Sequence, residues 1–205
     1  MKKKITVLFA LLTVALLCLV ACGNPGVKDL QKINDLLKID YSKVTVVVST
    51  KTETVELNGN YTLTFDGSDT NIEYKFERVA TFDVDSNGNI ADANGDFIET
   101  VEGTAVVRDG FVVDGDKIVD LPIEEINVSG FSFKQAFFSN ANINGAKFEA
   151  DVTNPQQFTG DPALVCTNMH VIVIRNTNAN TLTSIELTYT SENGAAVKIS
   201  YLFTK

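Results

Sequence analysis

The segment 83–90 has the residue types and spacing in this chain that point most directly to a chemical function. Oxygen-bearing side chains occupy every second place, with glycine sixth and an aliphatic residue eighth: Asp83, Asp85, Asn87, Gly88, Asn89 and Ile90. This order matches the start of a calcium-binding loop, and Ca²⁺ prefers such hard oxygen ligands. The twelfth place is Asn94 instead of a bidentate glutamate. The segment is therefore either a calcium site or a solvated connection whose Asn-Gly pairs form left-handed turns.

A cysteine and the only histidine form the second candidate for chemistry. His170 follows Cys166 by four residues, and on a regular strand this spacing puts both side chains on one side, where such a pair can form a nucleophile. The flanking residues Leu164, Met169 and Val171 are typical of a core strand, which favours a buried, inert cysteine. The chain has no serine elbow, phosphate-binding glycine loop or zinc-ligand spacing. We therefore predict a non-enzymatic protein, with a hydrolase as the weaker alternative.

Four phenylalanines gather within eight residues of a glycine-containing segment: Phe131, Phe133, Phe137 and Phe138. They are explained either by a packed core or by the mouth of an apolar cavity that binds a lipid or another apolar ligand. Leu63 and Tyr74 lie on the apolar side of two predicted strands and are the candidates for the opposite wall of that cavity.

The first 21 residues have the pattern of an export signal. Three lysines, Lys2 to Lys4, precede an uncharged apolar run from Ile5 to Val20, which is too short and wrongly flanked for a membrane-spanning helix. The four residues at the end of this run, Leu19-Val20-Ala21-Cys22, resemble the lipobox of bacterial lipoproteins. The resemblance implies cleavage before Cys22 and attachment of a diacylglycerol to its thiol; the alternative is an ordinary signal peptide with a chance cysteine.

This interpretation divides the chain into a signal peptide (1–21), a tether (22–27) and one β-rich domain (28–205). It places the protein on the extracytoplasmic face of the cell membrane, held by its lipid. Residues 1–21 contain three of the 17 basic residues and none of the 26 acidic ones, so the remaining chain carries 14 minus 26, or −12. This negative charge argues against nucleic-acid partners and against electrostatic binding to anionic lipid headgroups. No protein partner can be named.

Hydrophobic periodicity predicts one amphipathic helix followed by a sheet. Within Val27–Ile39, apolar residues recur every three or four positions and predict a helix with one apolar stripe. From Val44 onward, apolar and polar residues alternate in successive segments, as in an antiparallel sheet with one wet face. Met169–Ile174 is apolar at nearly every position and predicts a strand covered on both faces, whereas Asn193-Gly194 predicts a hairpin turn. A short helical turn is predicted at Pro122–Ile126.

The expected fold is therefore mainly β, with a curved antiparallel sheet or half-barrel packed on one N-terminal helix. This order of elements resembles the lipoprotein-carrier (LolA/LolB-like) family, which holds acyl chains between a curved sheet and a helical lid. The resemblance implies binding of a lipid or another apolar ligand. The alternative function is a structural or protein-interaction module of the cell envelope with a filled core, stabilised by calcium if the 83–90 loop binds the ion.

Overall fold

The computed structural model describes residues 25–52, 55–66, 69–81, 96–108, 111–115, 117–118 and 130–205. The elements in chain order are α2 (Val27–Leu37), β1 (Lys43–Lys51), β2 (Val55–Asp66), β3 (Asp69–Thr81), β4 (Asp96–Arg108), β5 (Phe111–Asp114), β6 (Lys117–Ile118), the 3₁₀ turn η2 (Gln135–Phe137), β7 (Phe138–Asn144), β8 (Lys147–Val152), α3 (Pro155–Thr159), β9 (Cys166–Asn176), β10 (Thr181–Ser191) and β11 (Ala196–Thr204). The predicted mainly β fold with one N-terminal helix on an antiparallel sheet is confirmed.

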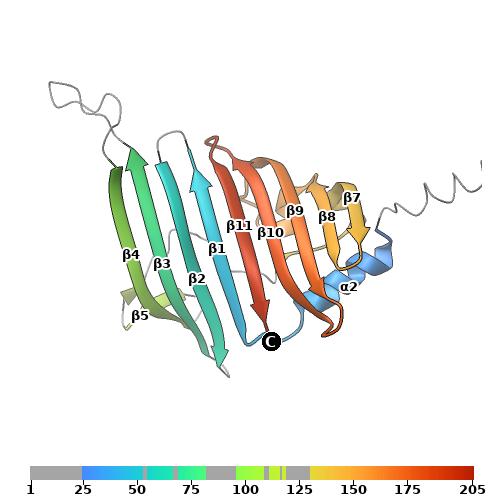
Figure 1. The fold of residues 1–205 in the computed structure, drawn as a ribbon, viewed down its shortest axis with the longest axis horizontal. Helices are drawn as coiled ribbons and strands as arrows, with labels where there is room; N and C mark the ends of the chain where they lie inside the picture. The colour runs from blue at the N-terminus through green and yellow to red at the C-terminus, as the bar shows by residue number, and fades with distance from the viewer. Residues whose placement is uncertain are drawn as a thin grey trace, which may run out of the picture.

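All these strands form one open sheet, in the order β6-β5-β4-β3-β2-β1-β11-β10-β9-β8-β7. Strands β1 to β6 form one meander that runs outward from the centre, and β7 to β11 form a second that runs inward. The two meanders join where β1 pairs with β11, from Lys43 opposite Thr204 to Lys51 opposite Ala196. Figure 1 shows the strands side by side across the long axis of the molecule, with α2 at the β7–β10 end.

The inner face of the sheet is the face on which α2 packs. Leu30, Ile33 and Leu36 of α2 are 0–3% exposed and belong to the same core as Val46 of β1 and Val171 of β9. Gly26 caps the start of the helix, and its N–H donates to the Asp29 carboxylate at 3.1 Å. The helix ends two residues earlier than its periodicity predicts, because the chain turns at Lys38 and Ile39 to enter β1.

Tyr41 fixes the angle between α2 and the sheet. Its buried hydroxyl donates to the carbonyl of Leu36 at 2.9 Å and accepts the N–H of Leu182 at the same distance. Burial raises the pKa of this phenol, although the hydrogen bond from Leu182 opposes the shift. One hydroxyl therefore joins the end of the helix to the start of β10.

In the β2–β4 region, aromatic rings lie over glycines on neighbouring strands. Gly59 is opposite Phe76 in the β2–β3 register, and Gly103 is opposite Tyr74 in the β3–β4 register. A Cβ built on Gly59 would overlap the Phe76 ring, and one on Gly103 would lie 2.6 Å from the Tyr74 hydroxyl. The missing side chains therefore leave room for rings to lie across the sheet, an arrangement known as aromatic rescue of glycine.

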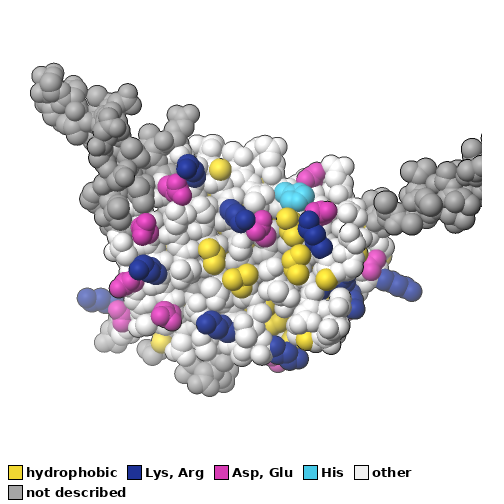
Figure 2. All heavy atoms as spheres, viewed as in Figure 1, with side chains coloured by type: hydrophobic (Ala, Val, Ile, Leu, Met, Phe, Trp, Pro, Cys, Tyr) yellow, Lys and Arg dark blue, Asp and Glu magenta, His cyan; other side chains and the backbone are white. Residues whose placement is uncertain are grey.

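The outer face of the sheet is polar and faces solvent. Ion pairs cross it between Lys198 and Glu186 at 2.8 Å and between Lys75 and Glu102 at 3.5 Å, and Figure 2 shows charged side chains spread over it. The strand predicted at Met169–Ile174 is part of β9, where Met169 and Val171 are buried on the inner face and Ile172 on the outer face is half-buried. The hairpin at Asn193-Gly194 is confirmed, with Gly194 at φ 82° between the paired strands β10 and β11.

Candidate functional site

The four phenylalanines of the predicted binding segment reach the inner face between α2 and strands β7 to β11. Phe131 stacks on Phe158 of α3 with ring centroids 5.3 Å apart, and Phe133 meets the same ring edge-on at 5.2 Å. Phe138 meets Phe148 of β8 edge-on at 5.4 Å. These contacts are typical of a packed aromatic core. Phe137 is also buried, and the Lys134 ammonium lies 5.4 Å from its ring centroid.

Asn34 attaches this aromatic segment to the helix. Its side-chain amide donates to the Phe133 carbonyl at 2.9 Å, while its side-chain oxygen accepts the Phe133 N–H at 2.8 Å. The segment at Phe133 is not part of a described strand, so the asparagine supplies both backbone partners that a sheet would otherwise provide. No local pattern predicts this contact, because the two residues are 99 positions apart.

Leu63 and Tyr74 lie in the other half of the sheet. Both are buried on the inner face, on β2 and β3, and the strand order places β1, β11, β10 and β9 between them and β8. The six predicted ligand-binding residues therefore belong to one hydrophobic core but do not surround one described cavity. Of the six, only Phe138 lines a described pocket.

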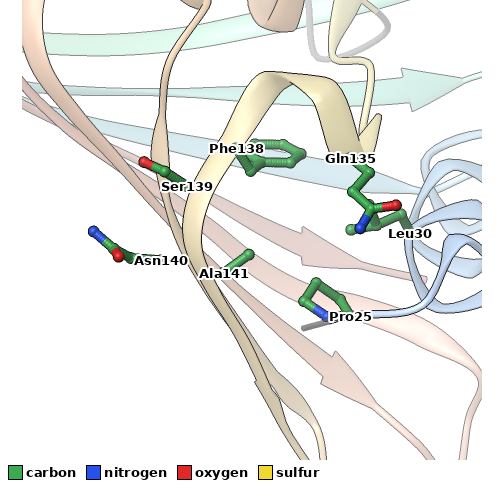
Figure 3. Close-up of a pocket in the computed structure, with 7 residues that line it drawn as sticks. All are labelled: Pro25, Leu30, Gln135, Phe138, Ser139, Asn140 and Ala141. Carbon is green, nitrogen blue, oxygen red and sulfur yellow. The ribbon is translucent and has the colours of Figure 1, made fainter. Parts of the chain in front are cut away.

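That pocket lies between the start of α2 and the edge strand β7, and its volume is about 200 Å³. It is lined by Pro25, Leu30, Gln135, Phe138, Ser139, Asn140 and Ala141. Figure 3 shows Phe138, Ala141 and Gln135 turned toward Pro25 and Leu30, whereas the side chains of Ser139 and Asn140 point away. The inward side chains are therefore apolar except for Gln135.

A β-bulge in β7 creates this lining. Ser139 pairs with Asp151 and Asn142 with Glu149, so β7 has one more residue than β8 across this interval. Asn140 has φ 50°, a left-handed conformation that asparagine tolerates better than most residues. The extra residue lets Phe138 and Ala141 share the inner face.

A second pocket, of about 430 Å³, lies where β2, β4 and β5 end and β3 begins. Its lining combines the polar residues Thr64, Asn71, Glu73, Thr104 and Asp114 with the apolar Ile72, Ala105 and Val113. This mixture differs from the predominantly apolar lining of a typical site for an apolar ligand.

The predicted Cys166–His170 pair is not formed. Between the pairs Thr190–Thr167 and Thr188–His170, β9 contains one residue more than β10, and Asn168 has φ 54°. This bulge reverses the alternation, so Cys166 packs against the inner core while His170 lies on the outer face. Burial raises the pKa of the Cys166 thiol, which disfavours the reactive thiolate.

His170 instead belongs to an outer-face network with Asp151. The Asp151 carboxylate accepts from the Asn140 amide at 2.7 Å and lies 2.8 Å from His170 Nδ1. The hydrogen bond from Asn140, followed by that with His170, lowers the pKa of Asp151. Asn140 therefore both forms the β7 bulge and orients the carboxylate beside the histidine. The sequence signal for this role, an asparagine within an alternating strand, is too common to identify it.

The remaining predicted sites fall outside the described residues. Cys22 precedes them, the loop with Asp83, Asp85, Asn87 and Asn89 lies in the gap 82–95, and the turn at Pro122–Ile126 lies in the gap 119–129. Within the described part of the chain, no group of three or more histidine, cysteine or acidic side chains could hold a metal ion. No helix of that part is both long and apolar enough to span a membrane.

Comparison with known proteins gives no family for this chain. No protein-family model matches it, and no curated protein matches its sequence.

Proposed function

We propose that the protein is a lipid-anchored, non-enzymatic module on the extracytoplasmic face of the cell membrane, with a structural or protein-binding role in the cell envelope. The observation that supports a module over a lipid carrier is the filled layer between α2 and the sheet. Ile33, Phe148 and Phe158 are fully buried there. A carrier needs a cavity of roughly 300 Å³ or more for its ligand, and the pocket beside α2 has only about 200 Å³.

The outer face fits contact with a protein better than contact with a bilayer. Val47 and Leu202 lie diagonally across the β1–β11 pair and are 42% and 44% exposed. Around them, lysines such as Lys198 and Lys75 are paired with glutamates. Exposed apolar side chains within a polar rim are typical of protein interfaces. Paired lysines leave little free positive charge for anionic headgroups, so membrane attachment in this proposal depends on Cys22.

The anchor is tested by cell fractionation and by labelling with a radioactive fatty acid. The Cys22→Ala variant should lose the label and leave the membrane fraction, because the thiol that carries the diacylglycerol is gone. Cys166→Ala is the matched control: it removes the other thiol of the mature chain and should keep both label and membrane attachment. A Cys22→Ala protein that stays tightly on membranes would refute the lipid anchor.

The choice between module and carrier is tested on the full chain purified in detergent. A module should bind an environment-sensitive apolar dye only weakly and without saturation, and mass spectrometry should find no lipid beyond the covalent anchor. Phe148→Ala, in the layer under α2, should then cost about 3–5 kcal/mol of unfolding free energy, as in a filled core. Stoichiometric dye binding that added phospholipid reverses, with a small stability loss at Phe148, would instead support the carrier function.

A further inference from the structure

The pocket at the start of α2 lies beside the point where the lipid-bearing residue must attach. Pro25 lines the pocket and is three residues after Cys22. Three residues span at most about 10 Å, so any group on the Cys22 thiol is confined to this end of the sheet. The N-cap contact of Gly26 with Asp29 at 3.1 Å holds the first turn of α2, directly after Pro25.

We propose that this pocket receives the ester-proximal part of an acyl chain carried by Cys22 of the same molecule. This inference depends on the proposed lipid anchor and adds an internal binding site for it. The occupant is the protein's own lipid because the volume, about 200 Å³, is below the range for a free small-molecule ligand. An acyl chain that is already tethered does not have to be fully enclosed in order to stay bound, because its covalent attachment gives it a high local concentration at the pocket.

The lining matches the chemistry of an ester-linked chain. Phe138 and Ala141 offer apolar surface for methylene groups beside the nearly buried Leu30, and Gln135 is the one polar side chain turned toward them, so the accessible surface of the pocket is part apolar and part polar. Its amide can donate a hydrogen bond to an ester carbonyl. The Asn140 amide is already engaged by Asp151 at 2.7 Å, so it does not compete for the lipid. The bulge that turns Ala141 inward is therefore a feature that the lipid site requires.

The test uses the full chain, expressed in bacteria fed a fatty acid with a diazirine in its carbonyl-proximal half. After illumination of the membranes, peptide mass spectrometry locates the crosslinks formed by the chain on Cys22. The expected result is intramolecular crosslinks to the α2 start and to residues 138–141. Crosslinks to bilayer lipids alone, with Cys22 carrying the label, would refute the pocket while leaving the anchor intact. Absence of label on Cys22 would refute the anchor itself.

A pocket-filling variant gives a second, independent readout. Ala141→Phe should abolish the intramolecular crosslinks and keep the label on Cys22, whereas Ala163→Phe, at an exposed position outside the pocket, should leave them unchanged. If Ala141→Phe fails to fold, amide hydrogen exchange of the wild type replaces it. Exchange at residues 138–141 should then be slower in the lipidated protein than in Cys22→Ala, and equal rates would refute the proposal.

Discussion

The two halves of the sheet bury their apolar face in different ways. In the half formed by β7 to β11, rings from three separate segments interlock under α2, as Phe133, Phe148 and Phe158 do. In the half formed by β2 to β4, Phe76 and Tyr74 lie over glycines of the neighbouring strands. The same alternating pattern thus serves two kinds of packing, and the residue opposite an aromatic ring decides which one forms.

The largest expected effect is in the interlocked half. Phe133→Ala should cost about 3–5 kcal/mol of unfolding free energy, because it removes a buried ring from a cluster that cannot collapse around the cavity. Chemical denaturation measures this cost. Leu202→Ala, at an exposed outer-face position, is the control and should change stability by less than about 0.5 kcal/mol. Equal costs for the two variants would mean that this half is not tightly packed.

The link between α2 and the sheet should give the next effect. Tyr41→Phe leaves the buried N–H of Leu182 without its acceptor, and the Leu36 carbonyl keeps only the longer contact from the Ile39 N–H at 3.4 Å. The expected loss is about 1–3 kcal/mol, again measured by denaturation. Ser42→Ala removes an exposed hydroxyl that contacts Thr204 and should be nearly neutral. A neutral Tyr41→Phe would show that this hydroxyl does not contribute to holding the helix on the sheet.

The glycine-dependent half is tested by adding one methyl group. Alanine normally stabilises a strand relative to glycine, by about 0.5–1 kcal/mol. At Gly59 the sign should reverse, with a loss of about 1–3 kcal/mol, because the new Cβ must displace the Phe76 ring. The loss should shrink when Phe76→Leu is combined with it in a double-mutant cycle. A stabilising Gly59→Ala would mean that the ring does not lie over the glycine.

The smallest effect is expected on the outer face. The pKa of Asp151 is lowered by Asn140 and His170. A lowered folded-state pKa adds stability above the unfolded pKa, about 3.9, and this stability disappears as the pH falls through the folded value. Because the carboxylate is 47% exposed, Asp151→Asn should cost only about 0.5–1 kcal/mol at neutral pH. Denaturation at several pH values tests this, and a difference that persists in strong acid would contradict the electrostatic explanation.

Sequence periodicity predicts the helix and the buried face of a strand wherever the strand register is unbroken. The stripe of Leu30 and Ile33 and the alternation around Val46 are local consequences of helix and strand geometry, and both are confirmed. Local patterns cannot predict that β1 pairs with β11, because that choice depends on which free strand edges meet. They also cannot predict the contact between Asn34 and Phe133, which exists only once the helix lies on the sheet.

The predicted Cys166–His170 pair fails for a specific physical reason. A strand alternates only while its register is unbroken, and the single extra residue near Asn168 moves the two side chains to opposite faces. The same effect at Asn140 brings Phe138 and Ala141 to one face, although their spacing on a regular strand would separate them. Asparagine at a left-handed position causes both departures, and nothing distinguishes these two asparagines from others in the sequence.

The open order of the strands also determines how far the molecule can extend from its point of attachment. Eleven strands leave ten spacings, which at about 4.8 Å each put β6 about 48 Å along the sheet from β7. If the lipid is on Cys22, the β7 edge stays near the bilayer surface while β6 can extend up to about 48 Å from it. A fluorophore at position 118 should therefore transfer energy to a bilayer dye far less efficiently than one at position 144. Equal transfer from both positions would mean that the sheet lies flat on the membrane.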